Sequence, residues 1–171
     1  GHLRMYRGGL VFSHFGVLSG QRLVEPWLSL LIVAATRSGQ RPATAWVITP
    51  GQVVQLVSPP EDEARELLQR LVALRRDGLG RLLPLPPALA FRVATDEGPR
   101  ALQHAFDALI SQRNALTHFG ITSFADLQAP RLQASDPRLP DTPQDASRFD
   151  ALAQWFFQPV LRAMAAGQVQ T

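Results

Sequence analysis

The stretch SPPEDEARELLQRLVALRRDGLGRLLPLPP, residues 58–87, contains the clearest helix signal in this chain. Ser58 and Glu61 have the Ser-x-x-Glu spacing of a capping box, and Pro59 suits the first helical position. Acidic residues crowd the start of this helix, where the helix dipole favours negative charge. The apolar positions predict one buried stripe, which consists of Leu67, Leu68, Leu71, Val72 and Leu74.

The end of the same stretch predicts a change from helix to extended chain. Gly78 is a typical residue to end the helix. Residues 82–87 hold three prolines, and each proline disfavours helical backbone at the residue before it. We therefore expect residues 82–87 to be extended.

The sequence before residue 58 predicts a strand, a helix and a hairpin. The helix is apolar around most of its circumference, which is typical of a helix buried on nearly all sides. Pro50 and Gly51 suit the central positions of a type II turn, so the β-prone runs that flank them are expected to pair. The expected elements are a strand over 3–12 interrupted by a Gly8-Gly9 turn, a helix over 21–36, and strands over 43–49 and 52–57.

Two further helices are predicted downstream, at 99–114 and 149–166. Residues 125–147 carry four prolines and little apolar periodicity, so we expect a proline-rich surface loop there. Residues 1–171 are expected to form a single domain of mixed α/β class in which helix dominates. Gly1 and His2 are typical of a tag remnant, and a start within a strand predicts a domain truncated at its N-terminus.

The residue types that are missing exclude several kinds of chemistry. All 17 basic residues are arginine, and without lysine the chain cannot form a Walker A loop or a Schiff base. The absence of cysteine excludes disulfides, Cys-type zinc sites and thiol nucleophiles, and fits a reducing cytoplasm. The longest apolar run, residues 27–35, is too short to span a bilayer. We therefore expect a cytoplasmic protein with no membrane partner.

No pattern nominates a catalytic residue. The four histidines do not have the spacing of metal ligands, and no Gly-x-Ser-x-Gly elbow is present. The acidic run from Glu61 to Glu63 has two interpretations, a divalent-metal site or a charged helix N-terminus, and its position favours the second. We predict no catalytic residue, no metal site and no cofactor in this chain.

One basic cluster points to a nucleic-acid partner. The first 24 residues contain three arginines and no carboxylate. The arginines are Arg4, Arg7 and Arg22, and Tyr6, His14 and Phe15 are interleaved with them. Arginine and aromatic side chains are the residues that contact phosphate backbones and unstacked bases. The alternative is a solvated strand with ordinary flanking charges.

The order of these motifs resembles the C-terminal region of the RecC family, the γ subunit of exodeoxyribonuclease V. In that family a leucine-rich helix with the pattern LxxLVxLxxxG leads directly into a Pro-Leu-Pro-Pro segment, as residues 66–87 do here. Tyr6–Gly9, Trp27–Leu31 and the closing helix over 149–166 are also similar to family elements. The resemblance covers most of residues 4–170.

The resemblance implies a degenerate PD-(D/E)XK fold, of the restriction-endonuclease type, related to the nuclease domain of the RecB subunit. In active relatives, one strand supplies an acidic residue followed two positions later by a catalytic lysine. The strand over residues 3–7 occupies that place and offers Met5, Tyr6 and Arg7. Methionine does not bind a hard divalent ion and arginine does not titrate, so the resemblance implies an inactive nuclease-like domain.

The resemblance also implies a place in a RecBCD-type helicase–nuclease that acts in double-strand break repair by recombination. The partners would be DNA and the RecB-like and RecD-like subunits, and those subunits would hold ATP and Mg²⁺. We expect a non-catalytic domain that handles DNA and docks subunits. Two alternatives remain open: an active metal-dependent nuclease with ligands outside this fragment, and a plain protein-interaction domain without DNA contact.

Overall fold

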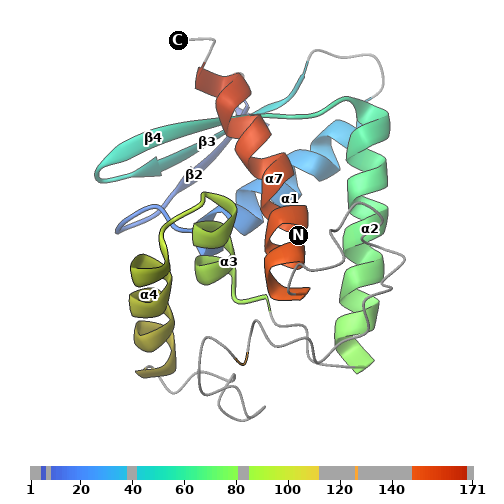
Figure 1. The fold of residues 1–171 in the computed structure, drawn as a ribbon. Coiled ribbons are helices and arrows are strands. Elements are labelled where there is room, and N and C mark those ends of the chain that lie inside the picture. The colour runs from blue at the N-terminus through green and yellow to red at the C-terminus, as the bar shows by residue number, and fades with distance from the viewer. Residues whose placement is uncertain are drawn as a thin grey trace. The chain divides into compact units, whose positions relative to one another are not determined.

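The computed structural model describes residues 5–6, 9–37, 42–80, 85–111, 126 and 148–168 (Figure 1). Its contacts divide the chain into two compact units. The first comprises Gly1–Asp77 with Pro159–Thr171, and the second comprises Gly78–Gln158. The expected mixed α/β class with helix dominant is confirmed.

The first unit is organised around a β-α-β crossover. Strands β2 (Gly9–Ser13) and β3 (Thr44–Thr49) are parallel, and helix α1 (Gly20–Thr36) connects them. Two parallel strands need a crossover of this kind, because a short turn joins only antiparallel neighbours. Leu10 lies opposite Ala45 in the register, and both side chains are fully buried.

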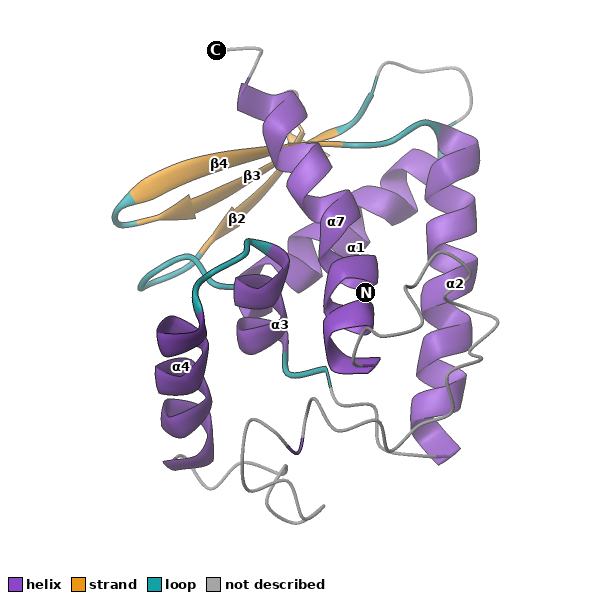
Figure 2. Cartoon of the chain, viewed as in Figure 1, coloured by secondary structure: helices purple, strands orange, loops and turns teal. Residues whose placement is uncertain are grey.

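Two antiparallel strands complete the sheet, which has the order β1-β2-β3-β4. Figure 2 shows β2, β3 and β4 side by side. Strand β1 (Met5–Tyr6) pairs with β2, so the predicted strand interrupted near Gly8-Gly9 is confirmed. Strand β4 (Gln52–Val57) pairs with β3 in the predicted hairpin.

The predicted type II turn in this hairpin is wrong. Gly51 does not have the positive φ that a type II turn requires, since Gly9 and Gly16 are the described glycines with positive φ. Proline is equally suited to the preceding position of a type I turn. The Thr49 hydroxyl donates to the Gln52 carbonyl oxygen at 2.9 Å and helps to close the turn.

The two faces of the sheet differ in burial. Residues at alternate positions along the strands form one face, and several of them are fully buried. Helix α1 packs against β2 and β3. The fully buried members of this face are Leu10, Ala45, Val47 and Leu56. Helix α1 is buried on most sides, as predicted, and Ile32 is the exposed exception among its apolar residues.

Helix α2 (Glu61–Gly80) does not begin or end where the sequence predicts. The Ser58 side chain does not cap the helix, because its hydroxyl accepts a hydrogen bond from the Ala43 N–H at 2.9 Å. The Ser58 N–H also donates to the Ala43 carbonyl oxygen at 2.8 Å. The predicted capping box is therefore wrong, the helix begins two residues after Pro59, and it continues two residues beyond Gly78.

The buried stripe of α2 is narrower than predicted. Ala64 and Leu74 are buried, whereas Val72 is 49% exposed. Val72 lies about 100° around the helix from Leu71, which turns it away from the packed face.

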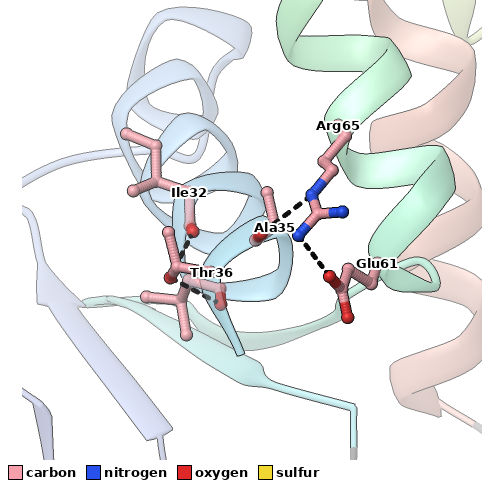
Figure 3. A network of polar contacts seen from close by, with 6 residues as sticks. Ile32, Ala35, Thr36, Glu61 and Arg65 are labelled. Carbon is pink, nitrogen blue, oxygen red and sulfur yellow. Dashed lines mark hydrogen bonds and ion pairs between the residues drawn. The ribbon is translucent and has the colours of Figure 1, made fainter. Parts of the chain in front are cut away.

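An arginine joins the end of α1 to the start of α2 (Figure 3). Arg65 Nε donates to the Ala35 carbonyl oxygen at 3.2 Å, and its guanidinium also forms an ion pair with Glu61. The last carbonyl groups of a helix have no hydrogen-bond partner within it and carry partial negative charge. A cationic donor there therefore supplies a hydrogen bond and also interacts favourably with the charge. The Thr36 hydroxyl donates to the Ile32 carbonyl oxygen at 2.9 Å in the same turn.

The second unit contains α3 (Pro87–Ala94), α4 (Pro99–Ser111) and the first turns of α7 (Arg148–Gln168). Pro86 is extended, as predicted, but Pro87 begins α3, a helix that the sequence did not predict. Proline at the first position of a helix is favourable, so the Pro-Pro pair starts a helix here. Residues 82–84 lie outside the described residues.

The predicted closing helix is confirmed as α7, in which the aromatic side chains of Phe149 and Phe157 are fully buried. Phe157 forms an edge-to-face contact with Phe91 of α3, with the ring centroids 5.4 Å apart. Residues 1–2, and all of 125–147 except Asp126, lie outside the described residues. No helix in the described ranges is long and apolar enough to cross a membrane.

The C-terminal end of α7 lies against strand β4 at Gly167. A Cβ atom at residue 167 would lie 2.3 Å from the Gln55 carbonyl oxygen and 2.9 Å from the Gln55 Cβ. Both distances are shorter than van der Waals contact, and one of the two atoms belongs to the backbone. Only glycine fits here without moving the helix or the strand.

We expect Gly167→Ala to lower the free energy of unfolding by about 1–3 kcal/mol, since the methyl group overpacks this contact. Alanine normally stabilises a helix by up to about 1 kcal/mol relative to glycine. A lower free energy of unfolding in Gly167→Ala would therefore come from the steric overlap and not from helix propensity. Urea denaturation measures it. Gly51→Ala is the control, because nothing lies within 4 Å of a Cβ at that position.

Arg65→Ala is expected to lower the free energy of unfolding by about 1 kcal/mol, because it removes the hydrogen bond to Ala35 and the pair with Glu61. Arg70→Ala is the matched control. Arg70 forms an exposed pair with Glu66 at the same spacing along α2, and such pairs contribute about 0.3–0.5 kcal/mol. Equal losses in the two variants would contradict a role for the Ala35 bond.

Candidate interaction surface

The structure describes one of the three arginines predicted to contact DNA. Arg4 and Arg7 lie outside the described residues. Arg22 lies in the first turn of α1, where its Nη1 donates to the Val17 carbonyl oxygen. Its guanidinium is therefore engaged by the preceding loop.

The loop from His14 to Ser19 is fixed at both ends. The His14 N–H donates to the Ile48 carbonyl oxygen at 2.9 Å, which attaches the start of the loop to β3. The Arg22 N–H donates to the Ser19 carbonyl oxygen at 3.0 Å at the other end. These bonds give the loop a defined conformation between β2 and α1.

Gly16 allows the loop to close around the Arg22 guanidinium. Its φ is +107°, a value that favours glycine. A Cβ at this position would lie 2.7 Å from Arg22 Nη2. The positive φ therefore favours glycine here, whereas the close approach involves only the flexible end of the arginine side chain.

This loop presents two apolar side chains to solvent. Phe15 is 96% exposed and Val17 is 84% exposed. The His14 side chain is half-buried, and its Nε2 is enclosed without a hydrogen-bond partner among the described residues. The loop thus exposes its apolar residues and encloses a polar atom, the reverse of the usual arrangement.

The outer face of the sheet, opposite α1, is also apolar. Val11, Ile48 and Val53 come from three successive strands and are 40%, 40% and 59% exposed. Ile48 lies directly opposite Val53 in the register, and Ser13, which leads into the loop, lies on the other side of Ile48. The exposed loop thus leaves the sheet beside this apolar face.

The surface is uncharged. Residues 8–21 and 42–60 contain no Asp, Glu, Lys or Arg, so strands β2, β3 and β4 and the loop after β2 lack a charged side chain. Phosphate binding relies on cationic side chains, whereas protein interfaces exclude charge from their centres. The arrangement fits burial against another polypeptide.

The residues that the sequence predicts on a degenerate motif strand are only partly described. Met5 and Tyr6 form β1, and Arg7 lies outside the described residues. Tyr6 lies opposite Gly9 in the register and is exposed. Within the described ranges, no group of three or more His, Cys, Asp or Glu side chains is arranged to hold a metal ion. The first turn of α2 holds the acidic run, and its Glu61 pairs with Arg65.

Sequence reasoning did not identify the apolar outer face, although a signal was present. Strands β3 and β4 read TAWVIT and QVVQLV, with apolar residues at both odd and even positions. A strand with one solvated face alternates apolar and polar residues, so apolar residues on both faces indicate that both faces are covered. The exposure of Phe15 and Val17 had no comparable signal, because it depends on the conformation of the loop.

Comparison with known proteins matches the chain to a family. The family model described as the RecC C-terminal domain matches residues 1–98, which is 98 of 171 residues. The matched range includes the sheet, α1, α2 and α3. The resemblance seen in the sequence is thereby confirmed. Comparisons with curated proteins and with solved structures gave no match.

We expect Arg22→Met, which retains an apolar stem, to loosen the loop. Hydrogen–deuterium exchange of the amides of residues 15–19 should accelerate at least about tenfold, since the variant loses a charged hydrogen bond of roughly 1.5 kcal/mol. Arg76→Met, at an exposed position of α2, is the control. Unchanged exchange in Arg22→Met would show that the guanidinium does not hold the loop.

Proposed function

Because the chain belongs to the RecC C-terminal domain family, we propose that it is a non-catalytic domain that docks subunits and handles DNA in a RecBCD-type exodeoxyribonuclease V. The observation that carries this proposal is the family match over residues 1–98. The partners would be the RecB-like and RecD-like subunits and DNA, in a cytoplasmic complex that acts in recombinational repair. ATP and Mg²⁺ would be held by the partner subunits.

The docking part of the proposal is supported by the uncharged surface. Exposed apolar side chains on three successive strands, and on the loop that follows β2, are stable when a partner covers them. A multisubunit enzyme supplies such partners. The apolar surface and the family membership are independent observations that favour the same role.

The non-catalytic part of the proposal rests on residue chemistry. If Met5, Tyr6 and Arg7 occupy the motif strand of a degenerate PD-(D/E)XK fold, the strand lacks both the acidic ligand and the lysine. No lysine elsewhere in this sequence is available to replace the missing one. The domain would then keep the architecture of a nuclease without its reaction.

The DNA-handling part rests on Arg4 and Arg7, since Arg22 is engaged by Val17. The engagement of Arg22 also favours a second candidate function, a protein-interaction domain that makes no DNA contact. The two candidates differ in their response to salt, because phosphate contacts release counterions.

The complete RecC-type protein, purified alone, is expected not to cleave linear duplex DNA in the presence of Mg²⁺. It should co-purify with its RecB-like and RecD-like subunits, and the reconstituted complex should degrade the same DNA when ATP is added. Robust cleavage by the RecC-type protein alone would overturn the non-catalytic assignment. Failure to associate with either subunit would overturn the docking assignment.

Arg4→Ala/Arg7→Ala in the complete protein is expected to weaken DNA binding and to reduce the slope of log K against log salt by about one for each phosphate that the arginines neutralise. Titration of a fluorescent duplex at several salt concentrations measures both quantities. Arg75→Ala/Arg76→Ala, at exposed positions of α2, is the matched double control. An unchanged slope in the Arg4/Arg7 variant would favour the second candidate.

A further inference from the structure

The loop His14–Ser19 has the properties of a protein-binding anchor. Phe15 is the most exposed of the large apolar side chains in the described residues, and Val17 is the next. Aromatic side chains that enter a pocket of a partner supply much of the binding energy of protein interfaces. The presence of two such exposed side chains within three residues distinguishes this loop from scattered surface hydrophobics.

The loop is held in place before any partner binds. Its start is bonded to β3 through the Ile48 carbonyl oxygen, and its middle is bonded to Arg22 through the Val17 carbonyl oxygen. Gly16 adopts a conformation that fits around the guanidinium. A loop that is already ordered loses little conformational entropy on binding, so its apolar contacts contribute more fully to affinity.

The charge distribution limits the chemistry of the partner. The loop and the three strands beside it contain no charged residue, and the nearby Arg22 guanidinium is turned to a carbonyl oxygen. A charge on the partner, opposite this surface, would be buried without a counter-charge, which is strongly unfavourable. The complementary surface is therefore uncharged and apolar.

The absence of charged residues in this loop and in strands β2, β3 and β4 also argues against single-stranded DNA as the partner that binds this surface. Bases stack on exposed aromatic rings, but binding of a strand also requires cations that follow its phosphates. Ile48 and Val53 extend the apolar surface from the loop onto the sheet, where the described residues of β2, β3 and β4 offer phosphates no counter-charge. The surface thus favours a polypeptide over a polynucleotide.

We propose that the loop His14–Ser19, together with Val11, Ile48 and Val53, is the docking surface for another polypeptide subunit, which receives Phe15 and Val17 in an uncharged apolar pocket. The identification of that polypeptide as a subunit of a RecBCD-type complex rests on the proposed function. Phe15 is the anchor, and Arg22 and Gly16 position it.

The test uses the complete RecC-type protein and its purified RecB-like and RecD-like subunits. Phe15→Ser/Val17→Ser is expected to weaken association with one of these subunits at least tenfold, as measured by biolayer interferometry. Phe15→Leu should retain most of the affinity, because leucine still fills an apolar pocket. Both residues are almost fully exposed, so thermal melting of the double variant should match that of the parent.

Val72→Ser is the control, since it removes an exposed apolar side chain from α2 and should change affinity less than twofold. If the parent protein binds its subunits and Phe15→Ser/Val17→Ser binds them equally well, the docking surface is wrong while the proposed function stands. If the parent does not bind them, the proposed function itself fails. A double variant that loses only oligonucleotide binding, or only self-association by light scattering, would also overturn the proposal.

Discussion

The parallel pairing of β2 with β3 is the constraint on which the rest of the first unit depends. Parallel neighbours require a crossover, and α1 supplies it while covering one face of the sheet. The pairing places Leu10 beside Ala45 in the core and brings the start of the loop after β2 next to Ile48. Strands β1 and β4 extend this arrangement, and Arg65 joins the end of the crossover helix to α2.

The same pairing explains why an uncharged loop is presented at the surface. The chain leaves β2 after Ser13 and must turn back to begin α1 at Gly20. The short loop between them is stabilised by Arg22, which serves as an internal hydrogen-bond donor. An arginine that composition alone assigned to DNA thus has a structural role in the loop, which is a common use of a planar group with several donors.

Local sequence signals predicted the elements with strong periodicity. Helices α1, α2, α4 and α7 and the β3–β4 hairpin are present as apolar spacing and turn residues indicated, although α2 begins and ends two residues later than predicted. The wrong predictions concern residues that have two possible hydrogen-bond partners or that suit two backbone conformations. Ser58 bonds to Ala43 across the sheet instead of capping α2, and such a long-range contact is not encoded in local spacing. Pro87 begins a helix because its position after Pro86 suits a first turn as well as an extended segment.

The surface was only partly predictable for a related reason. Apolar residues on both faces of β3 and β4 indicate that both faces are covered, but they do not indicate by what. The exposure of Phe15 depends on the bonds from Arg22 and His14, which exist only after the strands have paired. The basic cluster was visible in composition, whereas the engagement of one of its members by a carbonyl oxygen was not.

The contact of Gly167 with Gln55 bears on how this sheet avoids unwanted growth. Strand β4 contains neither charge nor proline, the two features that commonly prevent a sheet edge from recruiting another strand. The end of α7 lies against the carbonyl oxygen of Gln55 on this strand. The helix end thereby covers this edge strand at Gln55, where a further strand would otherwise pair with the exposed backbone.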